Sequence, residues 1–401
     1  MTKSRKFLLA FLVVVITLAV SAGAQTRRGS IIVPSSSIAQ PGDAGVKAHT
    51  NYVILKPEGV SPFSTIPTGE TPASLGCVYK LVQNPVPGCP INGSTSNPKG
   101  GAGIIAIVDA FDYPTALQDL QHFSQQFGLP APKFHKVKVG NPVNDCNWSI
   151  EMSLDIEWAH AMAPNAQILL VEANSNFNND LLAAVDQANQ LIAQHGGKGE
   201  VTMSWQGGET SNEAQFDSHF AQPGVVYFAS SGDSGGVVGW PSVSANVVSA
   251  GGTRVNRTNG NFTNETGWSG SGGGPSRFIA RPSYQDVVQN IVGTKRGTPD
   301  FSYDADPFSG ASVYNTNPSC GNIQWLTVGG TSLSSPALAG VVNSTGSFNT
   351  STAAENAEIY SNLGNSSVFT DITSGQAGQF KAVVGWDFVT GVGTDVGKTG
   401  K

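Results

Sequence analysis

A serine in the last quarter of the chain lies in a setting that favours nucleophilic chemistry. Gly329 and Gly330 come shortly before Ser332, and a helical pattern follows over residues 337–343. Glycines permit backbone angles and close approaches that a Cβ would prevent, and the positive end of a helix stabilises the charge that develops during acyl transfer. The pattern therefore favours Ser332 as an attacking hydroxyl. An ordinary helix N-cap with Pro336 in the first turn is the alternative.

Two carboxyls four residues apart form a candidate general base. Glu151 and Asp155 lie in residues 147–161, a segment with helical spacing that ends before Pro164. At this spacing both side chains project from one helix face. If that face is buried, both cannot ionise readily, so one pKa rises and the pair titrates as a unit. A solvated acidic face is the alternative, and Glu157 lies off the line that joins the pair.

A third acidic residue follows an apolar strand pattern. Asp233 lies in the glycine-rich turn of residues 231–236, directly after the apolar run of residues 225–230. Open α/β sheets bind ligands beyond the carboxyl ends of their strands. A protonated Asp233 in an apolar site could donate a hydrogen bond to a developing oxyanion. A turn aspartate that caps its own backbone is the alternative.

The elements that must position these residues alternate along the chain. From Gly103 onward, short apolar runs alternate with helical patterns, which predicts an α/β fold: a single large domain with a mostly parallel central sheet flanked by helices. The predicted strands are 104–108, 167–172, 201–204, 225–230 and 246–250, and the predicted helices are 114–126, 180–195 and 213–220. No repeat or linker divides this domain.

The N-terminus has the features of an export signal. Residues 1–24 combine a basic start, an apolar run over residues 7–20 and the small residues Ala22-Gly23-Ala24, which predicts a signal peptide. No later segment approaches the roughly 20 apolar residues of a membrane span, so we expect a secreted protein that does not contact the membrane after signal cleavage. Residues 25–70 are rich in Ser, Pro and Thr with little periodicity, which predicts a leader or extended arm.

Composition and cysteine count restrict the class further. Only 12% of the residues are charged and the net charge is −6, which argues against a nucleic-acid partner. The four cysteines are even in number, so two disulfides with three possible connectivities are expected in an exported protein. We favour Cys77 with Cys89 and Cys146 with Cys320. No Cys-x-x-Cys spacing indicates zinc.

Taken in order, the motifs resemble those of the sedolisin family of serine-carboxyl peptidases, which are related to subtilisin by fold. The shared motifs are Gly-Gly-Thr-Ser-x-x-x-Pro at 329–336, Glu-x-x-x-Asp at 151–155 and Ser-Gly-Asp at 231–233. Further similar segments are 72–79, 127–130, 272–276, 282–285 and 296–300. The resemblance extends from about residue 70 to 395, and it implies a peptidase catalytic domain over residues 71–401.

The resemblance also implies a role for each residue. Ser332 is the expected nucleophile that forms an acyl-enzyme, Glu151 its general base and later acid, Asp155 the group that orients Glu151, and Asp233 the oxyanion donor. A carboxylate base has an ordinary pKa far below that of histidine, so we expect peptide hydrolysis that is fastest in acid. Peptides or proteins are the expected substrates and a monomer the expected state.

A subtilisin-type triad is the nearest enzymatic alternative. Asp109 resembles the aspartate at a strand end in that family. None of the six histidines lies in a His-Gly-Thr context, however, so we expect Asp109 to be structural.

A structural calcium ion is expected near the C-terminus. The resemblance implies side-chain ligation by Asp371 and Asp387, with backbone oxygens from Ile372, Val383 and Gly385. These are the hard oxygen ligands that Ca²⁺ takes. Val383 stands where the family usually has glycine, and two turn aspartates are the alternative.

Two features leave the function open. Residues 204–209, with Trp205, resemble the segment that flanks the substrate in the family, yet the sequence does not distinguish an endopeptidase from a tripeptidyl-peptidase. Family members usually have a domain-sized inhibitory prosegment, whereas only about 45 residues lie between the signal and the region of resemblance. The second hypothesis is therefore an exported, non-catalytic binding protein that retains the peptidase fold.

Overall fold

The structure is a computed structural model of the 401-residue chain. It describes residues 29–92, 95–321 and 323–397. The predicted signal peptide and the first residues of the predicted arm lie outside these ranges. Within them, no helix has the length and apolar character needed to cross a bilayer.

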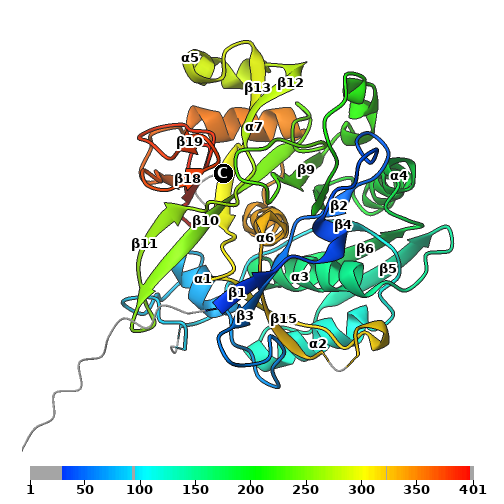
Figure 1. Ribbon diagram of the computed structural model, residues 1–401, viewed down its shortest axis with the longest axis vertical. Helices are drawn as coiled ribbons and strands as arrows, with labels where there is room; N and C mark the ends of the chain where they lie inside the picture. The colour runs from blue at the N-terminus through cyan, green and yellow to red at the C-terminus, as the bar shows by residue number, and fades with distance from the viewer. Residues whose placement is uncertain (1–28, 93–94, 322, 398–401) are drawn as a thin grey trace, which may run out of the picture.

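A mostly parallel sheet forms the centre of the molecule (Figure 1). Its strand order is β17-β20-β14-β10-β9-β7-β4-β6-β5, with β11 added alongside β10. Every neighbouring pair is parallel except β17 with β20 and β10 with β11. The strands are β4 (Ile104–Ala110), β5 (Lys133–Val139), β6 (Gln167–Ala173), β7 (Gly199–Met203), β9 (Val225–Ser230), β10 (Val248–Thr258), β11 (Asn261–Gly267), β14 (Phe301–Asp304), β17 (Phe369–Thr370) and β20 (Thr394–Asp395). The predicted α/β fold is confirmed.

Helices flank this sheet, and two of them meet at its centre. The helices are α1 (Pro72–Val78), α2 (Ala116–Phe127), α3 (Cys146–Met162), α4 (Asn178–Gln194), α5 (Gln289–Val292), α6 (Thr331–Asn343) and α7 (Thr352–Ser361). α3 packs against α6 in the middle of the molecule (Figure 1). Every residue of α3 from Trp148 to Met162 is buried, so this helix has no solvent-facing side. The helix predicted over residues 213–220 is instead a 3-10 helix.

Helix α6 begins six residues earlier than predicted, and Pro336 lies inside it. Proline has no N–H with which to reach the carbonyl of the residue four positions earlier, which is Ser332. That carbonyl oxygen lies 3.3 Å from the Ser204 hydroxyl, whose one proton is directed either to it or to Asp155 Oδ1, at the shorter distance of 2.8 Å. Gly330 precedes the helix with a φ of 111°. A left-handed backbone of this kind explains why glycine stands there.

The predicted N-terminal arm forms strands on the body of the molecule. A second, antiparallel sheet has the order β1-β3-β16-β15, built from β1 (Gly29–Ile32), β3 (Val53–Pro57), β16 (Trp325–Gly329) and β15 (Ala311–Tyr314). A separate short ladder joins β2 (His49–Thr50) to β8 (Trp205–Gln206). Because β16 leads into α6, the chain between β2 and β3 passes close to the start of that helix (Figure 1). Two further ladders pair β12 (Gly274–Ala280) with β13 (Lys295–Thr298) and β18 (Gln376–Ala377) with β19 (Phe380–Lys381).

Both disulfides that the sequence favoured are present. Cys77 at the end of α1 is bonded to Cys89 in the following loop. Cys146, the first residue of α3, is bonded to Cys320, which lies shortly before β16. The second bond therefore ties the helix with the carboxyl pair to the chain that leads to Ser332.

Candidate active site

The carboxyl pair of α3 is buried. Glu151 and Asp155 have no exposed surface, which excludes the solvated acidic face. Glu151 Oε2 accepts a hydrogen bond from the Asn51 backbone N–H at 3.2 Å, and Asp155 Oδ1 accepts one from the Ser204 hydroxyl at 2.8 Å. The second oxygen of each carboxyl is buried without a hydrogen-bond partner. Burial, the largest cause, raises the pKa of both groups well above its ordinary value.

Asp109, at the end of β4, is a third member of this cluster. It is fully buried, and neither of its carboxyl oxygens accepts or donates a hydrogen bond. Burial and then the charge of Glu172 raise the pKa of Asp109 to about 8. After burial, the charge of Asp109 is the largest cause that raises the pKa of Glu151 and Asp155. Asp109 therefore influences the electrostatics of the pair, which the sequence analysis did not foresee; its place at the end of an apolar strand was the available signal.

Ser332 is the second residue of α6 and is fully buried. Its hydroxyl donates to the Ser204 carbonyl oxygen at 3.2 Å. Hydrogen bonding by this hydroxyl also lowers the pKa of Glu151, against the larger effects of burial and Asp109 that raise it. The Ser332 backbone N–H donates to the Asn51 carbonyl oxygen at 3.0 Å. Ser332 thus lies beside Glu151 with its N–H directed at a peptide carbonyl.

Asp233 lies just after β9 and faces the start of α6. Its Oδ1 accepts hydrogen bonds from the Thr331 N–H at 2.8 Å and the Thr331 hydroxyl at 2.9 Å. Its Oδ2 is buried with no partner. Burial, opposed by the two bonds from Thr331, raises the pKa of Asp233 to about 7. Below that pH the acid is mostly protonated and has a proton to donate.

Gly330 shows where the free oxygen of Asp233 is directed. A Cβ on Gly330 would lie 2.2 Å from the Asn51 carbonyl oxygen and 2.6 Å from Asp233 Oδ2. Both oxygens therefore border the same small space beside the glycine. The Ser332 N–H donates to the Asn51 carbonyl oxygen and Asp233 Oδ2 borders the same space, an arrangement that resembles the two donors of an oxyanion hole.

The structure brings together the four residues singled out as catalytic, from α3, the turn after β9 and the start of α6. Glu157 is separate, because its Oε2 accepts from the Tyr314 N–H at 3.0 Å on another side of α3. Sequence reasoning missed Asn51, whose N–H and carbonyl contact Glu151 and Ser332. Nothing in the local sequence around Asn51 indicates these contacts.

The predicted calcium ligands lie on two segments, residues 371–372 after β17 and residues 383–387 after β19. Asp387 Oδ2 accepts from the Val383 N–H at 2.9 Å, and Asp371 Oδ2 accepts from the Gly385 N–H at 2.9 Å. Both carboxylates therefore hold the same short stretch of backbone. Among the described residues, no three or more His, Cys, Asp or Glu side chains are grouped so that they could hold a metal ion. A cation at this place would therefore also need backbone carbonyl oxygens as ligands. Two carboxylates with nearby carbonyls fit the oxygen-rich donor set of Ca²⁺.

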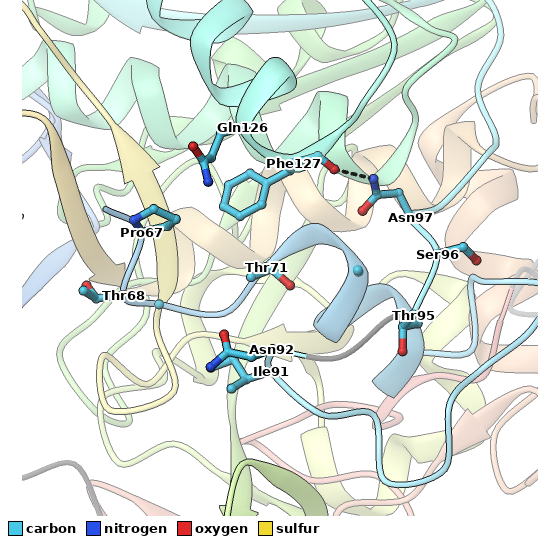
Figure 2. A pocket seen from close by; sticks show the side chains of 12 residues that line it. Pro67, Thr68, Thr71, Ile91, Asn92, Thr95, Ser96, Asn97, Gln126 and Phe127 are labelled. Atoms are coloured by element: carbon cyan, nitrogen blue, oxygen red, sulfur yellow. Dashed lines mark hydrogen bonds between the residues drawn. The ribbon is translucent and has the colours of Figure 1, made fainter. Parts of the chain in front are cut away.

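A hollow of about 600 Å³ lies elsewhere, between α1, the end of α2 and the loop before β4 (Figure 2). In it, the Asn97 side-chain amide donates to the Phe127 carbonyl oxygen at 2.7 Å. None of the four candidate catalytic residues lines the hollow, and its lining contains no ionisable side chain. Its described lining therefore offers no ionisable side chain for acid-base chemistry.

Comparisons with curated proteins find peptidases. The chain is 27% identical to sedolisin of Pseudomonas sp. (strain 101), over 79% of this chain and 60% of that protein. It is 28% identical to kumamolisin of Bacillus sp. (strain MN-32), over 83% of this chain and 63% of that protein. Tripeptidyl-peptidase 1 of Dictyostelium discoideum is 26% identical over 69% of this chain and 50% of its own length. The chain thus spans less than two thirds of the length of these relatives, and no protein-family model matches it.

Solved structures agree with these relatives. Pseudomonas sedolisin, a serine-carboxyl proteinase solved with two molecules of pseudo-iodotyrostatin, matches with a TM-score of 0.68 and 26% identity. The match covers 82% of this chain and 96% of that one. Sphericase matches with a TM-score of 0.52 and 19% identity, over 83% of this chain and 98% of its own, which supports the fold alone. The resemblance to sedolisins in sequence and in fold is confirmed.

Proposed function

We propose that this chain, a relative of the sedolisin family in sequence and in fold, is a serine-carboxyl peptidase that hydrolyses peptide bonds in peptides or proteins. The observation that supports this most strongly is the convergence of four groups. Ser332 lies beside the buried Glu151, while the Ser332 N–H and Asp233 Oδ2 face one carbonyl oxygen. A nucleophile, a base and an oxyanion site within one small volume are what acyl transfer requires.

In the proposed reaction, Glu151 accepts a proton when the acyl-enzyme begins to form and gives it to the leaving group. Glu151 accepts the Ser332 proton as Oγ attacks the substrate carbonyl carbon, and the Ser332 N–H and protonated Asp233 stabilise the resulting oxyanion. Glu151 then gives the proton to the leaving amine, and the acyl-enzyme forms. Water, activated by Glu151, hydrolyses the ester and regenerates Ser332. Asp155 is proposed as a positioning residue, since it lies one turn after Glu151 on α3 and the charge of Glu151 raises its pKa.

The mechanism needs Glu151 ionised and Asp233 protonated, so activity is limited on both sides in pH. The charge of Asp109 raises the pKa of Glu151 and of Asp155, and the charge of Glu151 raises that of Asp155, so the group titrates together. Within it, Glu151 is favoured as the first to ionise, because the Ser332 hydroxyl and the Asn51 N–H both stabilise its charged form. Asp233 must keep its proton and loses it as the pH rises through about 7. We therefore propose activity that declines at neutral pH.

Peptide hydrolysis by wild-type protein and Ser332→Ala tests the function. A mixed peptide library is incubated at about pH 4, near the ordinary carboxyl pKa, and the products are identified by mass spectrometry. Cleavage by the wild type and its loss in a folded Ser332→Ala variant would support the mechanism, and the product ends would distinguish an endopeptidase from a tripeptidyl-peptidase. Absence of cleavage after long incubation of folded wild-type protein would favour the non-catalytic binding protein.

We also propose a structural Ca²⁺ ion bound by Asp371 and Asp387, with the carbonyl oxygens of Ile372, Val383 and Gly385. When bound, the ion would offset the repulsion between the two carboxylates and fix the C-terminal loop. Calcium should raise the melting temperature of the wild type but not that of Asp371→Asn, in which one carboxylate is lost. A chelator that leaves the melting temperature unchanged would contradict this site.

The remaining proposals concern the whole chain. Export directed by residues 1–24 and a monomeric state follow from the sequence patterns. Secretion of a reporter fused after these residues and a sedimentation measurement test them.

A further inference from the structure

Thr331, the first residue of α6, makes two hydrogen bonds to one oxygen of Asp233. Its backbone N–H lies 2.8 Å and its hydroxyl oxygen 2.9 Å from Asp233 Oδ1. Thr331 is fully buried, so water does not compete for these bonds. A backbone N–H can only donate, whereas a hydroxyl can donate or accept. The direction of the hydroxyl bond therefore depends on the other contact of the Thr331 oxygen.

A third hydrogen bond fixes that direction. The Gly232 backbone N–H donates to Thr331 Oγ1 at 3.0 Å. This bond uses a lone pair of the hydroxyl oxygen and leaves its single proton for another acceptor. Asp233 Oδ1, at 2.9 Å, accepts that proton. Asp233 Oδ1 thus faces two donors, the N–H and the hydroxyl of Thr331.

The turn that supplies the Gly232 N–H is itself held by backbone hydrogen bonds. The Gly272 N–H donates to the Gly232 carbonyl oxygen at 2.7 Å, and the Ser231 N–H donates to the Ala250 carbonyl oxygen at 2.9 Å. Gly232 has a φ of 107°, a conformation that favours glycine. The Gly232 N–H therefore has a fixed position toward α6, and the Thr331 hydroxyl keeps one orientation.

The two donors on Oδ1 determine where a protonated Asp233 carries its own proton. A proton placed on Oδ1 would compete with the N–H and the hydroxyl of Thr331 for the same lone pairs. Asp233 Oδ2 is buried and has no hydrogen-bond partner. It lies 2.6 Å from the Cβ position of Gly330, beside the space that holds the Asn51 carbonyl oxygen. The neutral acid is therefore expected to carry its proton on Oδ2, next to the candidate oxyanion site.

We propose that Thr331 is a positioning residue that assigns the proton of Asp233 to Oδ2, from which it can be donated to the oxyanion. This rests on the proposed peptidase function. Thr331 acts through Asp233 and does not itself contact the reacting atoms. The proton on Oδ2 is needed once the oxyanion forms, so loss of the Thr331 hydroxyl should lower kcat and leave KM close to its wild-type value.

Two complementary variants separate the hydroxyl of Thr331 from its shape. Thr331→Val keeps the shape and removes the hydroxyl, whereas Thr331→Ser keeps the hydroxyl. With a peptide that the wild type cleaves, we expect Thr331→Val to lower kcat about tenfold, as the loss of one hydrogen bond to an ionisable group would, and Thr331→Ser to restore most of it. Thr327→Val is the matched control, because Thr327 is also buried but its hydroxyl bonds to Thr68. It should keep the wild-type kcat.

The pH profile and a second background test whether Thr331 acts through Asp233. The hydroxyl bond lowers the pKa of Asp233, so in Thr331→Val the decline in activity at neutral pH should move to higher pH. The charge of Asp233 also raises the pKa of Glu151 on α3, but Asp233 is neutral in acid, so the acid limb should stay in place. In an Asp233→Ala background, Thr331→Val should have little further effect. An equal loss of kcat in both backgrounds, or no rescue by serine, would overturn the proposal.

Infrared spectroscopy tests the orientation without an activity assay. The C=O stretch of a protonated carboxyl moves to higher wavenumber when its carbonyl oxygen loses a hydrogen bond. At about pH 5, where Asp233 is protonated, its band is the one that Asp233→Asn removes. This band should move to higher wavenumber in Thr331→Val and stay in place in Thr331→Ser, and an unchanged band in the valine variant would overturn the proposal. A shifted band in a folded protein that cleaves no peptide would instead overturn the peptidase function and leave the orientation of Asp233 standing.

Discussion

At the scale of single residues, the proposed chemistry needs two buried carboxyls in opposite states. Glu151 must be ionised to accept a proton, and Asp233 must be protonated to donate one. The Asn51 N–H donates to Glu151 and the neighbouring Ser332 hydroxyl also lowers the pKa of Glu151, whereas Thr331 binds only Oδ1 of Asp233 and its Oδ2 has no hydrogen-bond partner. Hydrogen bonds to the charged form lower a pKa and isolation in an apolar site raises it, so the surroundings separate the two roles.

Replacing Asp233 tests its role as an acid. In Asp233→Asn the side-chain oxygen can still accept from Thr331, while the amide can donate without needing a proton. We expect the decline in activity at neutral pH to move to higher pH. Asp233→Ala, which removes the donor, should lower kcat by about 10²- to 10³-fold. A pH profile of the asparagine variant identical to that of the wild type would contradict the assignment.

Asp109 is expected to tune the base without contacting substrate. With a pKa of about 8, Asp109 is charged only near and above that pH, so Asp109→Asn should leave the acid limb of the pH profile in place and change the profile only at neutral to alkaline pH. The profile of kcat/KM against pH measures this difference. Asp186→Asn, which changes a largely exposed carboxyl, is the matched control and should leave both limbs in place.

Residue type and spacing singled out Ser332, Glu151, Asp155 and Asp233 as candidates, which the structure brings together from the start of α6, the interior of α3 and the turn after β9. They were insufficient for Asp109, whose motif pointed to another family's triad. They were also insufficient for Asn51, because its contacts depend on a strand pairing between distant parts of the chain. Local sequence does not encode such pairings; they depend on how the whole domain packs.

At the scale of elements, α3 shows why the acidic pair could not be assigned from periodicity alone. Helix α3 is buried on all sides and has no polar stripe. The hydrophobic pattern of its sequence therefore does not indicate whether a charged residue faces solvent or the core. The start of α6 was missed for a related reason. Pro336 is typical of the first turn of a helix, whereas here it lies inside α6, where the Ser332 carbonyl oxygen has no helical N–H partner.

The two disulfides should differ in their effect on stability. Cys146–Cys320 joins residues 174 apart, whereas Cys77–Cys89 joins residues 12 apart. In the chain-entropy description, the longer loop stabilises by about 5 kcal/mol and the shorter by about 3 kcal/mol. We expect the double serine variant at 146 and 320 to melt at a lower temperature than the one at 77 and 89. Calorimetry measures the difference, and the reverse order would contradict the expectation.

At the scale of the whole molecule, buried acids should make the protein more stable in acid than at alkaline pH. Burial raises the pKa of Asp109 to about 8 and those of Glu172, Glu213 and Asp233 to about 7, from ordinary values near 4. The folded state therefore binds more protons than the unfolded state over this range, so stability falls as the pH rises from about 4 to about 8. His160 acts in the opposite sense, because burial lowers its pKa to about 4.

Urea denaturation at about pH 5 and about pH 8 measures this slope. The midpoint should be clearly higher at the lower pH. Glu172→Gln, which removes one of the raised carboxyls, should reduce the difference between the two midpoints. A midpoint that rises toward alkaline pH would contradict the expectation.

The contact between Asn51 and Ser332 also has a consequence for the order in which the protein is made. The arm is synthesised among the first segments, and β16 with α6 among the last, so the arm has no partner in this place until nearly the whole domain has emerged. Domains complete their non-local contacts only when the participating segments are available. An incomplete chain therefore contains the arm but lacks Ser332. The hydrogen bond between the Ser332 N–H and the Asn51 carbonyl oxygen can form only once the start of α6 has been made.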